Sequence, residues 1–186
     1  SPILVMGYTT PERSADAIRY GISLMVNTPE LASAFHQTAR QMNLKLAVHA
    51  KIDTGMSRLG VMPGEALNFC KHIASLNGLI FEGLFTHFAS ADEPILPTTL
   101  EQIERFNHVI AALQASGIRP QVIHASNSAA SLYFPSARYD AIRTGIAIYG
   151  LHPSFDDAQL PEDFEAALTW KSRIASIKTF PAGTGI

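Results

Sequence analysis

The sequence predicts an α/β protein that forms part of a (β/α)8 barrel of the TIM type. Short apolar runs rich in β-branched residues alternate with longer segments of helical period. Alternation of this kind produces a parallel sheet with helices outside it. A closed barrel needs eight such units, and we count about six. The predicted fold is therefore a partial barrel, followed by the start of a β-rich domain.

Six strand candidates follow one another along the chain. Apolar runs of this length that contain valine and isoleucine are typical of strands buried on both faces of a sheet. They are Ile3–Gly7, Ser23–Asn27, Leu44–Ile52, Leu79–Phe88, Val122–Ser126 and Ala141–Arg143.

Five helix candidates separate these strands. Several begin as helices should, because Thr28 can cap a helix that has Pro29 in its first turn, and Pro97 stands before Thr98. The candidates are Pro11–Tyr20, Thr28–Met42, Pro63–Leu76, Thr98–Ser116 and Ser128–Phe134.

The end of the chain has a different character. Residues 151–168, "LHPSFDDAQLPEDFEAAL", are acidic and contain proline, as a connection between domains would. The following "SRIASIKTF" suggests a strand. We therefore expect a partial barrel with its connection over residues 1–164 and the first strand of a second domain over 165–186. Two barrel units are expected before Ser1, and the rest of the second domain after Ile186.

Composition excludes several classes of function. The 186 residues carry a formal net charge of −2 with 14 Lys and Arg and no basic run, so nucleic acid is not an expected partner. No apolar run approaches the roughly 18 residues of a membrane span. Cys70 is the single cysteine, which excludes an internal disulfide and favours a cytoplasmic protein.

Polar residues gather where four of the predicted strands end, in "VHAKIDTGMSRLGV", "FTHFASADE", "HASNSAAS" and "IRTGIAIYG". Barrels carry their chemistry at this end. Ser128 would begin a helix whose unpaired N–H groups attract an anion, and Gly145 and Ile146 would add backbone donors. With two upstream units, these loops follow strands seven and eight, where barrels often hold a phosphate. The alternative for Asn127 and Ser128 is an ordinary helix cap.

The motifs "KIDTGMSRLG", "FTHFASADE", "SNSAAS" and "RTGIAIYG" resemble alanine racemase in order and spacing over nearly the whole chain. The resemblance implies pyridoxal 5'-phosphate as cofactor, with its phosphate held by Asn127, Ser128, Gly145 and Ile146. It implies interconversion of L- and D-alanine, which supplies D-alanine for bacterial peptidoglycan. It also implies a homodimer with shared active sites. Relatives that act on serine or other amino acids leave the substrate open.

The resemblance places Arg143 opposite the pyridine nitrogen of the cofactor and His124 as the residue that orients Arg143. A guanidinium there would keep the ring nitrogen unprotonated, which weakens the ring as an electron sink and favours simple reprotonation. The alternatives are a structural ion pair for Arg143 and a core histidine for His124.

The resemblance also assigns catalytic positions to Arg58, near the ring hydroxyl and the substrate carboxylate, and to His87, over the ring. The matching lysine, Lys51, is commonly carbamylated in the family and would then hold Arg58. An unmodified Lys51 paired with Asp53 is the alternative, because a buried lysine needs a partner. His87 taken alone could equally be a core histidine.

Two groups that racemisation requires are expected outside this chain. The family places the Schiff-base lysine before Ser1 and the opposing tyrosine in the second domain, so the chain alone is expected to be inactive. Three rival functions remain open. They are a pyridoxal-phosphate barrel without turnover, a metal-dependent hydrolase using Asp53, His87 and His124, and a non-catalytic interaction domain. We expect no metal.

Overall fold

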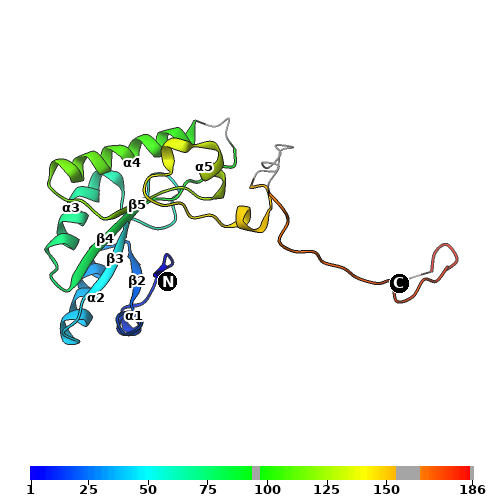
Figure 1. Cartoon of the computed structure of the whole chain (residues 1–186), viewed down its shortest axis with the longest axis horizontal. Coiled ribbons are helices and arrows are strands. Elements are labelled where there is room, and N and C mark those ends of the chain that lie inside the picture. The colour runs from blue at the N-terminus through cyan, green and yellow to red at the C-terminus, as the bar shows by residue number, and fades with distance from the viewer. Residues whose placement is uncertain (94–96, 154–163, 185–186) are drawn as a thin grey trace.

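A computed structural model describes residues 1–93, 97–153 and 164–184 of the chain. Five strands form one parallel sheet in the order β1-β2-β3-β4-β5, so each strand pairs with its neighbours in sequence (Figure 1). The strands are β1 Ile3–Val5, β2 Ile22–Val26, β3 Leu46–Lys51, β4 Leu79–Phe85 and β5 Val122–His124. This order is that of an incomplete barrel, which confirms the predicted fold class.

Helices connect the successive strands, and all five predicted helices are confirmed. The segment predicted as one helix from Pro11 begins as a 3-10 turn. Thr28 caps its helix as expected, because its hydroxyl accepts the N–H of Leu31 at 3.1 Å. The elements are η1 Pro11–Arg13, α1 Ser14–Tyr20, α2 Pro29–Gln41, α3 Pro63–Ser75, α4 Thr98–Ala115, α5 Ser128–Tyr133, η2 Pro135–Ala137 and η3 Ile146–Tyr149.

The apolar core lies between the sheet and its helices. Alternate side chains of β2 and β3, such as Leu24 and Val48, point toward this outer face. They belong to one cluster with three aromatic residues of the helices, Phe35 of α2, Phe69 of α3 and Phe106 of α4. The opposite, inner face of the sheet is therefore left for the polar side chains of the same strands.

The prediction of a sixth strand at Ala141–Arg143 is wrong. Only Ala141 bridges to His124 of β5, in parallel. The chain turns on both sides of this segment, because Tyr139 has a φ of 44° before it and η3 begins at Ile146 after it. The segment still lies beside β5, where the next strand of a barrel would lie. The N–H of Arg143 donates to the carbonyl of Ser126 at 2.9 Å.

Residues 164–184, which include "SRIASIKTF", contain no helix or strand, so the strand of a second domain stays a prediction. A strand needs a neighbour for its hydrogen bonds, and this segment runs away from the sheet (Figure 1). Its apolar side chains Trp170, Ile174 and Ile177 are exposed. Most of the predicted connection, residues 154–163, lies outside the described residues. The division into domains at residue 164 stays a prediction.

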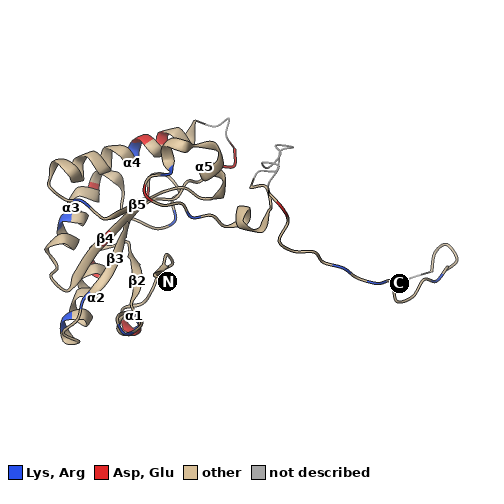
Figure 2. Cartoon of the chain, in the orientation of Figure 1, with Lys and Arg blue, Asp and Glu red and all other residues tan. Residues whose placement is uncertain are grey.

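Charged residues of both signs are interspersed along the helices (Figure 2). That distribution differs from the single-sign stripe of nucleic-acid-binding domains. Among the residues that the structure describes, no helix is long and apolar enough to cross a membrane.

Candidate active site

Polar side chains from the carboxyl ends of β3, β4 and β5 meet on the inner face of the sheet. Lys51 is the last residue of β3, His87 follows β4, and His124 is the last residue of β5. Arg143 joins them from the loop beyond Ala141. The structure thus brings together four of the residues that the sequence singled out.

Arg143 is the centre of this group. One guanidinium nitrogen, Nη1, donates to Nδ1 of His124 at 2.7 Å. The other, Nη2, donates to the carbonyls of Thr86 and Ala125, both at 2.8 Å, and lies 3.2 Å from Nδ1 of His87. Burial lowers the pKa of Arg143 to about 10, so the group remains a cation at neutral pH. Its partners are carbonyls and imidazoles, so the ion-pair alternative does not describe its contacts.

Both histidines beside Arg143 are neutral. Burial, followed by the charge of Arg143, lowers the pKa of His124 to about 3 and that of His87 to about 4. An arginine has only donors, so the Nδ1 atom of each imidazole accepts and its proton lies on Nε2. His124 therefore orients Arg143 from one side and His87 borders it on the other.

Lys51 is buried, with 6% of its surface exposed, and its Nζ lies 4.7 Å from the centre of the Phe85 ring. Burial lowers the pKa of Lys51 to about 7, with Arg143 and Arg58 acting in the same direction and Asp53 opposing them. At neutral pH, Lys51 is therefore an uncharged amine in a large fraction of the molecules.

Asp53 binds backbone N–H groups of the loop that follows it, rather than pairing with Lys51 alone. Its carboxylate accepts the backbone N–H groups of Gly55, Met56, Ser57 and Arg58 at 2.9 to 3.1 Å. Burial raises the pKa of Asp53, but these four donors outweigh it and hold the pKa below its usual value. The loop between Lys51 and Arg58 is thus closed around one carboxylate.

The loop carries Arg58 as an exposed side chain. Its charge is one cause of the lowered pKa values of Lys51 and His87. Gly60 closes the loop, because a Cβ there would lie 2.8 Å from the backbone nitrogen of Asp53.

Sequence reasoning missed Gln102 of α4. Its carboxamide oxygen accepts the N–H of Ala89 at 2.9 Å, and its nitrogen donates to the carbonyl of His87 and to the hydroxyl of Thr54, both at 3.2 Å. Gln102 thereby ties the loop after β4 to the loop after β3. The available signal was a polar residue at a buried helical position, between Thr99 and Phe106.

The loops after β5 and Arg143 converge on one hydroxyl. Ser128 Oγ accepts the N–H groups of Gly145 at 2.8 Å and Ala147 at 3.3 Å. Ile146, which the sequence suggested as a backbone donor to a phosphate, lies between these two residues. Asn127 acts as the helix cap that was its alternative, because its carboxamide oxygen accepts the N–H of Ala130 at 2.9 Å. A hydroxyl and backbone N–H groups gathered in one place are the kind of group that can bind a phosphate.

The metal-hydrolase alternative conflicts with these contacts. The Asp53 carboxylate accepts four backbone N–H groups, while His87 and His124 both face Arg143. Within residues 1–93, 97–153 and 164–184 no cluster of three metal-ligating side chains occurs.

Comparison with known proteins assigns the chain to a family. Residues 1–153 match the family model described as the N-terminal domain of alanine racemase. The chain belongs to the alanine racemase family. This finding confirms the family resemblance on which the site residues were predicted.

Individual alanine racemases agree with this assignment. The chain is 42% identical to the alanine racemase of Desulfovibrio desulfuricans over 185 residues and 39% identical to that of Symbiobacterium thermophilum over 186 residues. All of this chain is covered in both comparisons, against 50% and 49% of the relatives. The chain thus spans about half the length of these relatives.

Solved alanine racemases share the fold. The enzyme of E. faecalis superposes with a TM-score of 0.81 at 35% identity, over 90% of this chain and 45% of that one. The enzyme of Clostridium difficile 630 superposes with a TM-score of 0.80 at 37% identity, over 83% and 40%. The five strands are therefore part of an alanine racemase barrel.

Proposed function

We propose that the protein containing this chain interconverts L- and D-alanine with pyridoxal phosphate bound on the inner face of the sheet. The observation that carries the proposal is the pairing of a half-buried cation, Arg143, with a set of phosphate donors around Ser128. Family membership supports it, because the relatives are named alanine racemases. The D-alanine would serve peptidoglycan synthesis in the cytoplasm.

The residues present fit this cofactor. The hydroxyl of Ser128 and the backbone N–H groups of Gly145 and Ile146 would bind its phosphate. Ala147 donates its N–H to Ser128, and Asn127 caps α5 beside this loop. When bound, pyridoxal phosphate supplies the electron-withdrawing ring that acidifies the α-proton of the substrate.

Arg143 would face the ring nitrogen and keep it unprotonated, because a fixed cation disfavours a second positive charge. His124 would hold the guanidinium in that direction. His87, neutral and half-buried, would border the ring with a donor on Nε2. Arg58 would bind the substrate carboxylate with two parallel N–H groups.

Lys51 would carry a carbamate. An uncharged lysine amine adds to carbon dioxide and releases one proton, so a pKa of about 7 makes the reaction accessible at neutral pH. The product is an anion, which Arg143 and Arg58 would stabilise, whereas the same two arginines disfavour a protonated Lys51. Intact mass in bicarbonate and carbon-13 spectra of the labelled carbamate test this assignment. A Lys51 that stays unmodified under saturating bicarbonate would contradict it.

Deuterium exchange at the α-carbon tests the main proposal. The full-length protein that contains this chain is incubated with L-alanine or L-serine in deuterated water, and both enantiomers are followed. Label in D- and L-alanine is the expected result, and faster labelling of serine would assign the serine alternative. Exchange with neither, together with cofactor absorbance, would identify a pyridoxal-phosphate protein without turnover.

Two further proposals concern the whole protein. It would form a homodimer whose partner subunit completes each active site, which sedimentation of the full-length protein tests. The chain of 186 residues alone would be inactive, and measurable racemisation by it would contradict this.

A further inference from the structure

A hydrogen-bonded row of side chains continues from Arg143 across four strands of the sheet. His124 of β5 lies beside His49 of β3, with Nε2 and Nδ1 2.9 Å apart. The other nitrogen of His49, Nε2, lies 2.9 Å from Oε2 of Glu82 of β4. Ser23 of β2 donates its hydroxyl to the same oxygen at 2.6 Å. Ser23 and Glu82 lie outside the motifs that identified the site, and His49 was given no role there.

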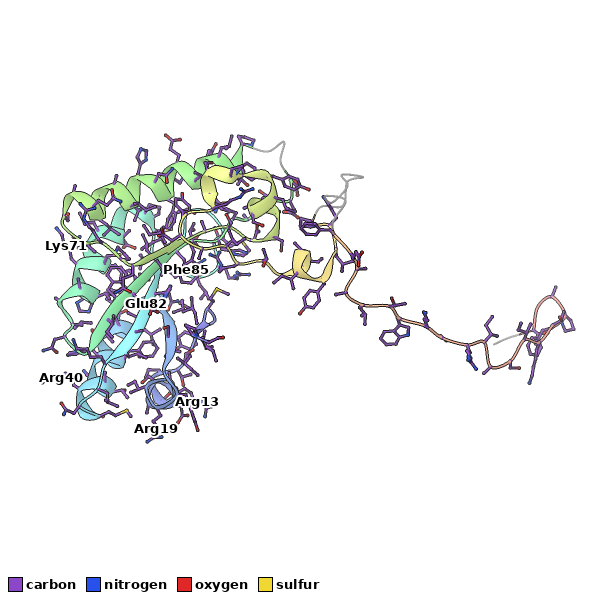
Figure 3. The ribbon with its side chains drawn as sticks, in the orientation of Figure 1. Arg13, Arg19, Arg40, Lys71, Glu82 and Phe85 are labelled. Carbon is purple, nitrogen blue, oxygen red and sulfur yellow. The ribbon has the colours of Figure 1, made fainter. Side chains whose placement is uncertain are left out.

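The sheet is shaped to hold His49. Glu82 is an extra residue in β4, because Val48 pairs with Phe81 and His49 pairs with Gly83. This bulge lets Glu82 contact His49 and Phe85 contact Lys51, although regular alternation would place residues 82 and 85 on opposite faces. Figure 3 labels both Glu82 and Phe85. A Cβ on Gly83 would lie 2.1 Å from Nδ1 of His49, so only glycine leaves room for the ring.

The direction of every hydrogen bond in the row follows from its two ends. Arg143 has only donors, so Nδ1 of His124 accepts and its proton lies on Nε2. That proton is donated to Nδ1 of His49, whose own proton must then lie on Nε2. His49 donates it to Glu82. Burial raises the pKa of Glu82, but Ser23 and His49 outweigh it and lower the pKa, so this residue is an ionised acceptor.

We propose that Glu82 and His49 are positioning residues that hold the Arg143 guanidinium in place by fixing the tautomer of His124. Without the carboxylate, His49 can carry its proton on Nδ1 and donate back to His124. Nε2 of His124 then accepts, and the proton of His124 moves to Nδ1, where it points at an N–H of Arg143. Two donors that face each other repel, and the guanidinium is displaced. The role of Arg143 beside the cofactor ring rests on the proposed function, whereas the assignment of the His49 and His124 tautomers does not.

Nitrogen-15 spectra of the histidine rings test the proposal in the full-length protein. In the wild-type protein, His49 and His124 should both carry the proton on Nε2. Glu82→Leu should shift His49 toward the other tautomer, and Glu82→Gln should not, because its carboxamide oxygen still accepts. Glu104→Leu, an exposed change on α4, is the matched control. A proton on Nδ1 of either ring in the wild-type protein would overturn the proposal, and this result depends on no variant.

Kinetics give a second measurement. Glu82→Leu removes the carboxylate that orients His49, and Gly83→Ala displaces the His49 ring, so each should lower kcat for alanine about tenfold. They should also change the absorption spectrum of the bound cofactor, while KM changes less because neither residue contacts substrate. Glu82→Gln should recover most of the kcat. Wild-type kcat and spectrum in Glu82→Leu would overturn the proposal. If the wild-type protein racemises neither alanine nor serine, the proposed function fails while the ring spectra still decide the tautomers.

Discussion

The two faces of the five-stranded sheet carry opposite kinds of side chain. The outer face is apolar, and Leu24 and Val48 pack there against aromatic residues of the helices. The inner face carries His49 and Lys51 from the strand that also contributes Val48. Alternation along a strand separates these sets with a period of two residues. Changes on the outer face should therefore affect the free energy of unfolding, and changes on the inner face the chemistry.

The largest expected effect tests the outer face. Phe106→Ala removes a fully buried ring from the core and should lower the free energy of unfolding by about 3–5 kcal/mol. Activity per folded molecule of the full-length protein should stay within about twofold, because Phe106 faces away from the site. Urea unfolding gives the stability, and Leu100→Ala, at an exposed position of α4, is the control. A loss below about 1 kcal/mol would contradict this prediction.

The second prediction tests the inner face. Arg143→Leu should lower kcat about a hundredfold, because it removes the fixed cation at the proposed ring nitrogen. Arg143→Lys should not restore it, since an ammonium cannot contact Thr86, Ala125 and His124 together. Steady-state rates of the full-length protein measure both. Arg40→Leu, an exposed change on α2 (Figure 3), should have wild-type rates, and near-wild-type rates in Arg143→Leu would reject the role.

The third prediction uses the pH dependence of stability to test the histidines of the inner face. The pKa values of His87 and His124 are lowered to about 4 and about 3, so between those values and 6.5 the unfolded chain binds more protons. Stability should therefore fall as pH falls through that window, by about 1.4 kcal/mol per pH unit for each histidine. Denaturant unfolding at several pH values measures the slope.

Replacing one of these histidines provides the control. His124→Gln should flatten the slope by about one proton, because the titrating imidazole is removed. An identical slope in the wild-type and His124→Gln proteins would show that this inner-face imidazole does not control acid stability.

The smallest expected effect lies far from the site. Thr28→Ala removes the cap of α2 and should cost about 1 kcal/mol of stability with no change in rate. Thr28→Ser keeps the hydroxyl and should retain most of that stability. Thermal unfolding resolves the difference, and a change in kcat for Thr28→Ala would show that the two faces are coupled.

Local patterns were sufficient to predict most of the fold. Strand and helix positions follow from the alternation of apolar runs, and all five helices and five of six strands appear. The sixth failed because three residues between two turns can form only the bridge at Ala141. The strand at residues 172–180 stays a prediction, because a strand depends on a neighbour, which a local pattern does not report.

The candidate site was predicted through its motifs, and the structure refines it. Lys51, His87, His124 and Arg143 come together because the carboxyl ends of parallel strands meet at one edge of the sheet. Gln102 was missed because its role depends on which loops α4 covers. Ala147 was missed because the turn at η3 decides which N–H groups face Ser128.

The sequence by itself therefore determined the fold class, the order of the elements and the family, since these depend on local periodicity and on motifs in order. Tertiary structure alone decided the row from Arg143 to Ser23. His49 and His124 are 75 residues apart, and Glu82 meets His49 only because a bulge shifts the register and Gly83 leaves space for the ring. Hydrogen-bond direction depends on both partners at once, so no single segment of the chain could have specified it.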